Sequence, residues 1–524
     1  MTDVPSFNLW TAQWLALERA EGPPERTGIE QALLRAHEFT AIYDSSPLVV
    51  VGVHRLLTAI LQAALNPQHP RDLEKLWREG RFPQSEIKKF GTRYTGRFDV
   101  FSAKEPFLQS GELPLKPGKG DKAKTAAYLF IEAPSGTEIT HYRHGSDEGK
   151  RFCPACAASG LVIIPCFAAA GGAGIKPSIN GVPPVYVIPT GQTFFESLTA
   201  SLVLPRYQPE VASKKKDLVW WERPTIVGKS KEVKEVGYLH SLTFPARRVR
   251  LHPEPLNTDC SRCGQHSEWG IRTMVFEMGE SRPKDSAFWF DPFAAYKVPT
   301  EKSDKAPTPI RPQEGKALWR EFASLFLPQS QGEEKKGLVV RPSVLYQIAN
   351  EDIGVERPSF AFRCVGMRTD MKAKVFEWID AEFSVPAALL DDEDAERIVR
   401  EATQFATDCE KVIAGTFREV FRGSSKKAER HKRLKNHMQA AYWAALAAPF
   451  RDFVLAIAES ARRAEAQKQW AETVVHGAQR AFNAAAEATG DDAVTLRQQV
   501  EGQRKCAFRL AKTRNAYLLE GETE

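Results

Sequence analysis

The spacing of apolar residues divides the chain into two parts. Up to about residue 370, short apolar runs alternate with Pro-Gly turns and polar loops, which is typical of mixed helices and strands. From about Val385, proline and glycine become rare, alanine becomes dense, and apolar residues recur every three or four positions. We therefore predict an α+β protein, with a large mixed α/β domain over residues 1–370 and an all-α four-helix bundle over residues 371–524.

The first part contains apolar runs bounded by turn residues, which predict strands or short buried segments. The clearest runs span residues 126–134, 160–168, 183–191, 236–244 and 273–278. Helices are predicted over residues 28–43, 47–64 and 193–204. The run from Pro47 is the most apolar, but His54 and Arg55 interrupt it, so we expect a buried core helix and no membrane span.

Three interruptions split the last part of the chain into four predicted helices. Residues 423–425 end the first helix, Pro449 begins another, and residues 489–492 precede the last. The first helix opens on the acidic run 391–396, which suits a helix N-terminus, and its apolar stripe extends to Phe417. Four such helices fit an antiparallel bundle.

The length, net charge and N-terminal sequence bear on the number of domains, the class of partner and the cellular location. A chain of 524 residues is too long for one core, so two or three domains are expected. The formal net charge of +6 favours an acidic partner such as nucleic acid only slightly. No N-terminal segment has the order of a signal peptide, so we expect a cytoplasmic protein with reduced cysteines.

Two CxxC pairs stand out among the eight cysteines. Cys153 and Cys156 form one pair, and Cys260 and Cys263 form the other about a hundred residues later. Two such pairs are typical of a tetrahedral structural zinc ion, which carries out no chemistry when all four ligands are thiolates. The alternatives are chance, or one redox motif with a stray pair. The remaining cysteines lie in apolar contexts typical of core residues: Cys166, Cys364, Cys409 and Cys506.

Motifs of common catalytic sites are missing from the sequence. It contains no GxxxxGK[ST], no GxGxxG opening a helix, no HExxH and no GxSxG. The glycine-rich stretch 171–174 is therefore not a phosphate loop of these types. His141 and His144, close to Asp147 and Glu148, leave one alternative open, a zinc-containing enzyme that processes nucleic acid. A polar loop leading to the first CxxC pair is the simpler interpretation, and the sequence favours a binding protein.

Basic residues cluster where they could contact phosphates. Lys426, Lys427, Arg430 and Arg433 lie in a predicted helix, in which residues 426, 430 and 433 share one face. Further basic residues lie in a predicted strand and in two loops: Arg247, Arg248, Arg250, residues 116–124 and residues 214–216. A solvated helix face is the alternative for the first group. Together these clusters make nucleic acid the best partner class.

Several short motifs, in this order, resemble a known family. They read FNLW, RFDVFSAKEPFLQ, APSGTEITHYRHGSDE, CPACAASGL, GGAGIKPSINGVPP, PTGQTFFESL and CSRCGQ. Their order and spacing resemble the large subunit, CasA, of the type I-E CRISPR surveillance complex Cascade, and the resemblance covers essentially the whole chain.

The resemblance implies a non-catalytic subunit with an α/β domain and a C-terminal four-helix bundle. Such a subunit binds the 5′ end of the guide RNA and recognises the protospacer-adjacent motif of duplex target DNA through the minor groove. It then helps to open the duplex and recruits the helicase–nuclease. The first domain would carry guide-end and motif recognition, and the bundle would contact target DNA and other Cascade subunits. Sequence readout beyond the motif belongs to base pairing with the guide.

The resemblance also assigns residues. The DNA-contacting glycine loop corresponds to Gly171, Gly172, Ala173 and Gly174, with Lys176 as a phosphate anchor. Small residues suit a backbone that enters a groove only about 6 Å wide. Arg282 and Lys284 are candidates for the lysine finger of the family. The guide-end loop corresponds to Thr140, His141 and Tyr142.

The wedge that parts the first base pair corresponds to Thr369, Asp370, Met371 and Lys372. Met371 stands where the family has glutamine, so a hydrogen-bonding tip is not expected here. An apolar side chain can still insert between base steps.

Overall fold

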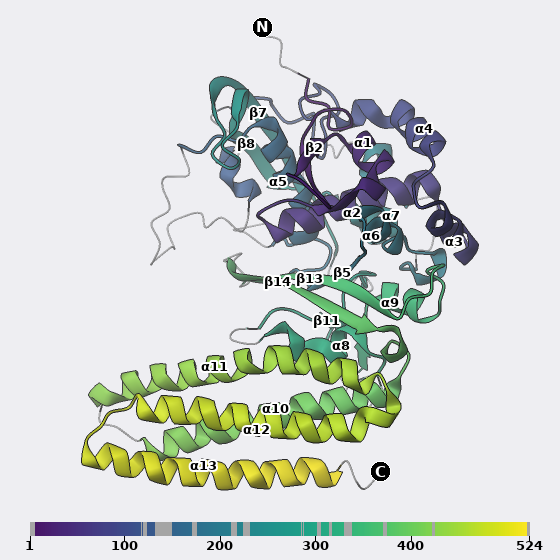
Figure 1. Ribbon diagram of the computed structural model, residues 1–524. Helices are drawn as coiled ribbons and strands as arrows, with labels where there is room; N and C mark the ends of the chain where they lie inside the picture. Colours follow the sequence, from purple (N-terminus) through teal and green to yellow (C-terminus); the bar gives the residue numbers. More distant parts are fainter. Residues whose placement is uncertain are drawn as a thin grey trace. The chain divides into compact units, whose positions relative to one another are not determined.

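A computed structural model describes most of the chain as two compact units (Figure 1). The described residues are 6–116, 118, 123–130, 149–169, 175–210, 217–223, 231–283, 286, 288–300, 305–313, 317–329, 338–369, 375–421 and 425–520. Unit 1 comprises Met1–Pro312 and Val340–Ser384, and unit 2 comprises Gln313–Val339 and Val385–Glu524. The sequence predicted this order, with mixed helices and strands first and long helices after them.

The boundary between the units differs from the predicted one at residue 370. Strands β13 (Ser359–Thr369) and β14 (Val375–Pro386) are hydrogen-bonded neighbours in a sheet of order β14-β13-β5. Residue 370 therefore lies between two paired strands of unit 1. The chain also enters unit 2 early, through residues 313–339, and returns at β12 (Leu338–Val340).

The N-terminal half of unit 1 surrounds one buried helix. Its elements are β1 (Leu15–Arg19), β2 (Glu25–Thr27), α1 (Ile29–Leu34), β3 (Phe39–Ile42), α2 (Pro47–Leu65), α3 (Pro70–Glu79) and α4 (Gln84–Tyr94). The strands form an antiparallel sheet of order β2-β1-β3. Helix α2 confirms the predicted core helix, whereas the predicted helix over 28–43 is divided between α1 and β3.

The rest of unit 1 is built around a long hairpin. Its helices are α5 (Pro154–Phe167), α6 (Phe194–Ala200), α7 (Tyr238–Leu242) and α9 (Ser343–Ala349). Its strands include β4 (Ala123–Thr125), β5 (Tyr186–Thr190), β6 (Lys231–Glu232), β7 (Arg247–Asp259), β8 (His266–Met278), β9 (Glu280–Ser281), β10 (Tyr296–Val298) and β11 (Thr308–Pro309). Strands β7 and β8 form the antiparallel hairpin, and β4 pairs with β8.

Two of the predicted strand segments are helices. Residues 160–168 fall mostly in α5, whose residues are all buried, so no polar face reveals its period. Residues 236–244 contain α7, whose first amides at Leu239 and His240 donate to the distant Asp217 carboxylate. Of the predicted segment 126–134, Ala126–Leu129 is a 3₁₀ turn, and residues 131–134 lie outside the described residues.

Helices α2 and α5 pack closely at Gly52. A Cβ atom on Gly52 would lie 2.5 Å from the carbonyl oxygen of Val162, so only glycine permits this approach. Helix α2 is long and apolar enough to cross a membrane, but 83% of its apolar window is buried inside the protein. Residues 428–457 meet the same length and composition test, with 39% buried.

Unit 2 is a bundle of four long helices. They are α10 (Glu393–Val420), α11 (Ser425–Ile457), α12 (Arg463–Glu487) and α13 (Ala493–Glu520). The predicted break at Pro449 is wrong, because α11 runs through it and the chain turns after Ile457 instead. Proline removes a hydrogen bond to Ala445, an exposed residue whose carbonyl can be satisfied by water.

The segment 313–339 joins this bundle through Trp319 and the short helix α8 (Phe322–Phe326). The Trp319 ring lies 4.5 Å from that of Phe450 and 6.2 Å from that of Trp470. The indole of Trp470 in turn donates to the Ala402 carbonyl at 3.0 Å, so one aromatic cluster links α11, α12 and α10.

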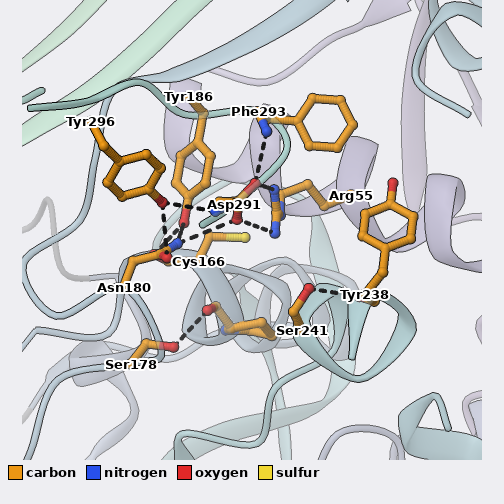
Figure 2. Close-up of polar contacts among 11 residues, drawn as sticks. Arg55, Cys166, Ser178, Asn180, Tyr186, Tyr238, Ser241, Asp291, Phe293 and Tyr296 are labelled. Atoms are coloured by element: carbon orange, nitrogen blue, oxygen red, sulfur yellow. Dashed lines mark hydrogen bonds and ion pairs between the residues drawn. The ribbon is translucent and has the colours of Figure 1, made fainter. Parts of the chain in front are cut away.

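A buried ion pair lies at the centre of unit 1 (Figure 2). Arg55 of α2 donates to both carboxylate oxygens of Asp291, at 3.1 and 2.8 Å, and the side chains are 3% and 0% exposed. Burial by itself would lower the pKa of Arg55, but the neighbouring groups, of which the Asp291 carboxylate acts most strongly, together outweigh burial and the pKa is raised. Asn180 donates to Asp291 at 3.3 Å, and the Asp291 amide donates to the Tyr296 hydroxyl at 2.9 Å.

Asp291→Asn should destabilise unit 1 strongly, because it leaves the Arg55 guanidinium buried without a counter-charge. We expect the free energy of unfolding to fall by about 3–5 kcal/mol. The matched control is Asp380→Asn. Asp380 also pairs through two hydrogen bonds with an arginine, Arg363, but these side chains are 34% and 23% exposed, so we expect a loss below about 1 kcal/mol. Urea unfolding followed by tryptophan fluorescence compares them, and equal losses would contradict the prediction.

Candidate metal centre and DNA-contact segments

The two CxxC pairs come together in unit 1. Cys153 caps the N-terminus of α5 and accepts a hydrogen bond from the Cys156 amide at 3.5 Å. Cys260 and Cys263 lie at the turn between β7 and β8, and the Cys153 amide donates to the Cys260 sulfur at 3.3 Å. Gly264 adopts a φ of +70°, which a tight turn after Cys263 requires.

The geometry of the four sulfurs fits a tetrahedral metal ion. All four Sγ atoms lie within 4.8 Å of one another, and three of the residues are buried. The Cys153 and Cys263 sulfurs are 3.8 Å apart, too far for a disulfide. This distance matches the edge of about 3.8 Å of a tetrahedron with Zn–S bonds of about 2.3 Å.

A metal held here would join α5 to the β7–β8 hairpin, and a neighbouring arginine ties the hairpin turn to two further segments. Arg262, between the two hairpin cysteines, pairs with Asp44 and lies 4.9 Å from the centre of the Phe130 ring. With four thiolate ligands, the ion would have no open position for substrate, so its role would be structural. We searched the described residues for groups of cysteine, histidine and acidic side chains that could hold a metal ion. The four cysteines form such a group.

The predicted glycine loop is described only at its flanks. Gly171, Gly172, Ala173 and Gly174 lie outside the described residues, whereas Ala169 and Lys176 are described. The Lys176 ammonium pairs with the Glu232 carboxylate at 2.6 Å, and both side chains are about half exposed. Its backbone amide donates to the sulfur of Met278 in β8 at 3.2 Å. Sequence reasoning missed Glu232, since nothing local to either residue indicates the pairing.

The three arginines of β7 confirm the predicted strand but do not face solvent. Arg247, Arg248 and Arg250 are 5%, 5% and 4% exposed. Arg248 pairs with Glu277 at 3.2 Å, and Arg250 donates to the carbonyls of residues 102 and 103. These guanidinium groups bind the protein itself, so they are not the phosphate contacts that the sequence suggested.

Most of the other predicted DNA and RNA contacts lie outside the described residues. These are Lys284, Asp370, Met371, Lys372, Thr140, His141, Tyr142 and His144. Thr369 ends β13, at the hairpin where the wedge was predicted. Arg282 is described, and its guanidinium donates to the Lys234 carbonyl at 3.2 Å, while burial lowers its pKa.

The predicted basic face lies on α11 of unit 2. Arg430 donates to the Ala488 carbonyl at 2.8 Å, so it contributes to bundle packing. The Arg433 side chain is 81% exposed and lies 3.7 Å from Glu429, a pairing that solvent screens. Lys426 and Lys427 belong to the same helix, but their side chains lie outside the described part.

Comparison with known proteins gives matches over almost the full length. A family model described as CRISPR-associated protein Cse1 matches residues 8–481. The CasA/Cse1 protein of Thermus thermophilus is 28% identical over 529 residues, covering 96% of this chain and 97% of that protein. Cse1 from Acidimicrobium ferrooxidans has a TM-score of 0.78 at 21% identity, covering 98% and 99% of the two chains. A chain of a CRISPR RNA-guided surveillance complex has a TM-score of 0.71 at 19% identity, covering 97% and 100%.

Replacing one cluster cysteine should remove the metal and loosen the junction of α5 with the hairpin. We expect purified protein to carry about one zinc per chain, and Cys156→Ser to lose it and to unfold at a lower temperature. Cys409→Ala is the matched control, because Cys409 is buried in the other unit, away from the cluster. Elemental analysis and thermal unfolding with and without a strong chelator measure both effects. Metal-free wild-type protein, or full zinc content in Cys156→Ser, would contradict the assignment.

Proposed function

The chain belongs to the family of CRISPR-associated Cse1 proteins, also called CasA, and we propose that it is the large, non-catalytic subunit of a type I-E surveillance complex. The family match over residues 8–481 carries this proposal. The fold shared with a chain of an RNA-guided surveillance complex supports it. Its partners would be the other Cascade subunits and the 5′ end of the guide RNA.

Within that complex, the proposed task of unit 1 is to recognise the protospacer-adjacent motif in duplex DNA. Lys176 supports this proposal, because this lysine follows the glycine-rich segment 171–174 closely in the sequence. A segment of small residues can approach the floor of the minor groove, which side chains would block. A neighbouring lysine then neutralises a phosphate at the groove edge. The minor groove offers a degenerate pattern, which suits recognition of several related motifs.

Glu232 adds a competitor to this contact. The Glu232 carboxylate holds the Lys176 ammonium in the free protein, and a DNA phosphate would have to replace it. An exposed ion pair contributes little stability, so this exchange costs little. Glu232 therefore holds Lys176, the proposed phosphate anchor, only weakly. Weak pairing suits a protein that samples many DNA sites.

The later steps are assigned to other segments. The hairpin β13–β14 carries the proposed wedge between Thr369 and Val375, and a hairpin tip can insert between base steps. The exposed Arg433 on α11 is a candidate contact for target DNA. Recruitment of the helicase–nuclease completes the proposed role.

Gly172→Leu tests the groove contact. In the assembled complex with guide RNA, we expect it to weaken binding of motif-bearing duplex at least about tenfold, because the added side chain prevents backbone approach. Gly96→Leu is the control, since a Cβ atom on Gly96 meets no heavy atom within 4 Å. Electrophoretic mobility shift of motif-bearing and motif-free duplex, by complexes with and without this subunit, is the measurement. Unchanged binding by Gly172→Leu would contradict the proposal.

Lys176→Ala and Glu232→Gln should shift DNA binding in opposite directions. Loss of the ammonium should weaken binding and reduce the salt dependence by about one phosphate contact, whereas loss of the carboxylate should strengthen binding. Lys75→Ala is the control, because Lys75 is an exposed lysine that likewise faces a carboxylate, Glu79, at 3.9 Å. Affinities at several salt concentrations report both effects. A change in the same direction for both variants would be inconsistent with this pairing.

A further inference from the structure

One buried arginine bridges the two flanks of the glycine-rich segment. Arg247 of β7 donates through Nη2 to the Ala169 carbonyl at 2.6 Å and through Nη1 to the Lys176 carbonyl at 2.8 Å. The two carbonyls belong to residues on either side of the segment 170–175. A single planar guanidinium group therefore fixes the distance between the ends of this segment.

Arg247 is a buried cation whose hydrogen bonds go mainly to backbone carbonyls. Its side chain is almost completely buried, and burial lowers its pKa to about 10, which still leaves it charged at neutral pH. Its hydrogen-bond partners in the described part of the chain are backbone carbonyls and the Met278 sulfur, with no carboxylate among them. Burial of a charge without a counter-ion is costly. An apolar residue would fill the site at lower cost but could not hold two carbonyls.

Arg247 also closes a frame that begins at the four cysteines. Helix α5 leaves the cluster at Cys153 and, over 14 residues or about 21 Å, reaches the start of the segment. Strand β7 runs between the Cys260 end of the hairpin and Arg247. Helix α5 contacts β8 on the way. The two elements are thus joined at the cysteines and joined again at Arg247.

A second link at the same place does not involve the arginine. The Ser178 amide donates to the Ala168 carbonyl at 2.7 Å, and its hydroxyl donates to the Pro165 carbonyl at 2.7 Å. Ser178 therefore ties the segment back to the last turn of α5, whereas Arg247 ties both flanks to the hairpin. Loss of Arg247 would leave the loop closed but free to move relative to β7.

We propose that Arg247 is a positioning residue for motif recognition, which holds the flanking residues Ala169 and Lys176 in the arrangement that DNA binding requires. This inference rests on the proposed function. Flanking residues that are already fixed lose less conformational entropy on binding, so their preorganisation favours the specific complex. Non-specific binding depends chiefly on phosphate neutralisation and is less sensitive to this geometry.

The test uses the assembled complex and the ratio of its affinities for motif-bearing and motif-free duplex. Arg247→Met should reduce this ratio by about tenfold to a hundredfold, as expected for loss of buried hydrogen bonds to a charged group. Arg247→Lys should fall between wild type and Arg247→Met, because an ammonium lacks the planar fork. Hydrogen exchange should increase at the amide of Lys176.

Arg250 provides the matched control on the same strand. It is equally buried, burial also lowers its pKa, and it too donates to two backbone carbonyls, at 3.0 and 3.3 Å, but these belong to Ser102 and Ala103. Arg250→Met should therefore reproduce any general loss of stability while leaving the affinity ratio unchanged.

Two outcomes overturn the inference. Either Arg247→Met keeps the wild-type ratio, or Arg250→Met lowers it equally. If Arg247→Met does not fold, Arg247→Lys decides, and a wild-type ratio in that variant also overturns the inference. A wild-type complex that does not distinguish the two duplexes refutes the proposed function instead.

Discussion

The buried ion pair between Arg55 and Asp291 is the constraint on which unit 1 depends. Two charges removed from water depend on the polar groups packed around them, so the segments that carry those groups must be held in place. The network continues from Asp291 to Asn180, from Asn180 to the Tyr186 hydroxyl at 3.2 Å, and from Tyr186 to the Cys166 carbonyl at 3.0 Å (Figure 2). It therefore fixes the last turn of α5 and the chain that follows the glycine-rich segment. Both ends of the proposed DNA-contacting loop rest on this network.

The cysteine cluster and the ion pair act at opposite ends of α5. The cluster holds the helix N-terminus at Cys153, and the ion-pair network holds its C-terminus at Cys166. Binding residues carried on loops are positioned accurately only when rigid elements support them. Gly52 contributes by allowing α2, which carries Arg55, to pack closely against the middle of α5. Residues that are distant in the sequence thus cooperate to position the two flanks of the glycine-rich segment.

The sequence predicted those features of the structure that depend on residues close together in the chain. The stripe to Phe417 predicted α10, and the spacing of the CxxC pairs predicted a cluster that the structure brings together. Helix α5 was missed because it is buried on all sides, and the break at Pro449 was wrong because the carbonyl that proline leaves unpaired belongs to an exposed residue, Ala445. The membership of residues 313–339 in unit 2 and the contacts of Arg247 arise from tertiary packing between distant segments. Neither the amino-acid composition nor the spacing of apolar residues indicates such contacts between distant segments.

The burial of basic residues changes how the net charge of the protein should be interpreted. The formal charge of +6 favoured an acidic partner only slightly, and Arg55 and the three arginines of β7 are enclosed and bind protein groups. These charges do not form a broad phosphate-binding face, and Lys176 is itself paired with a carboxylate. Among the described residues, these buried arginines therefore add little to affinity from counterion release. If unit 1 recognises DNA as proposed, Arg247 contributes more by holding the flanking residues Ala169 and Lys176 than by attracting phosphates, because its guanidinium group is buried.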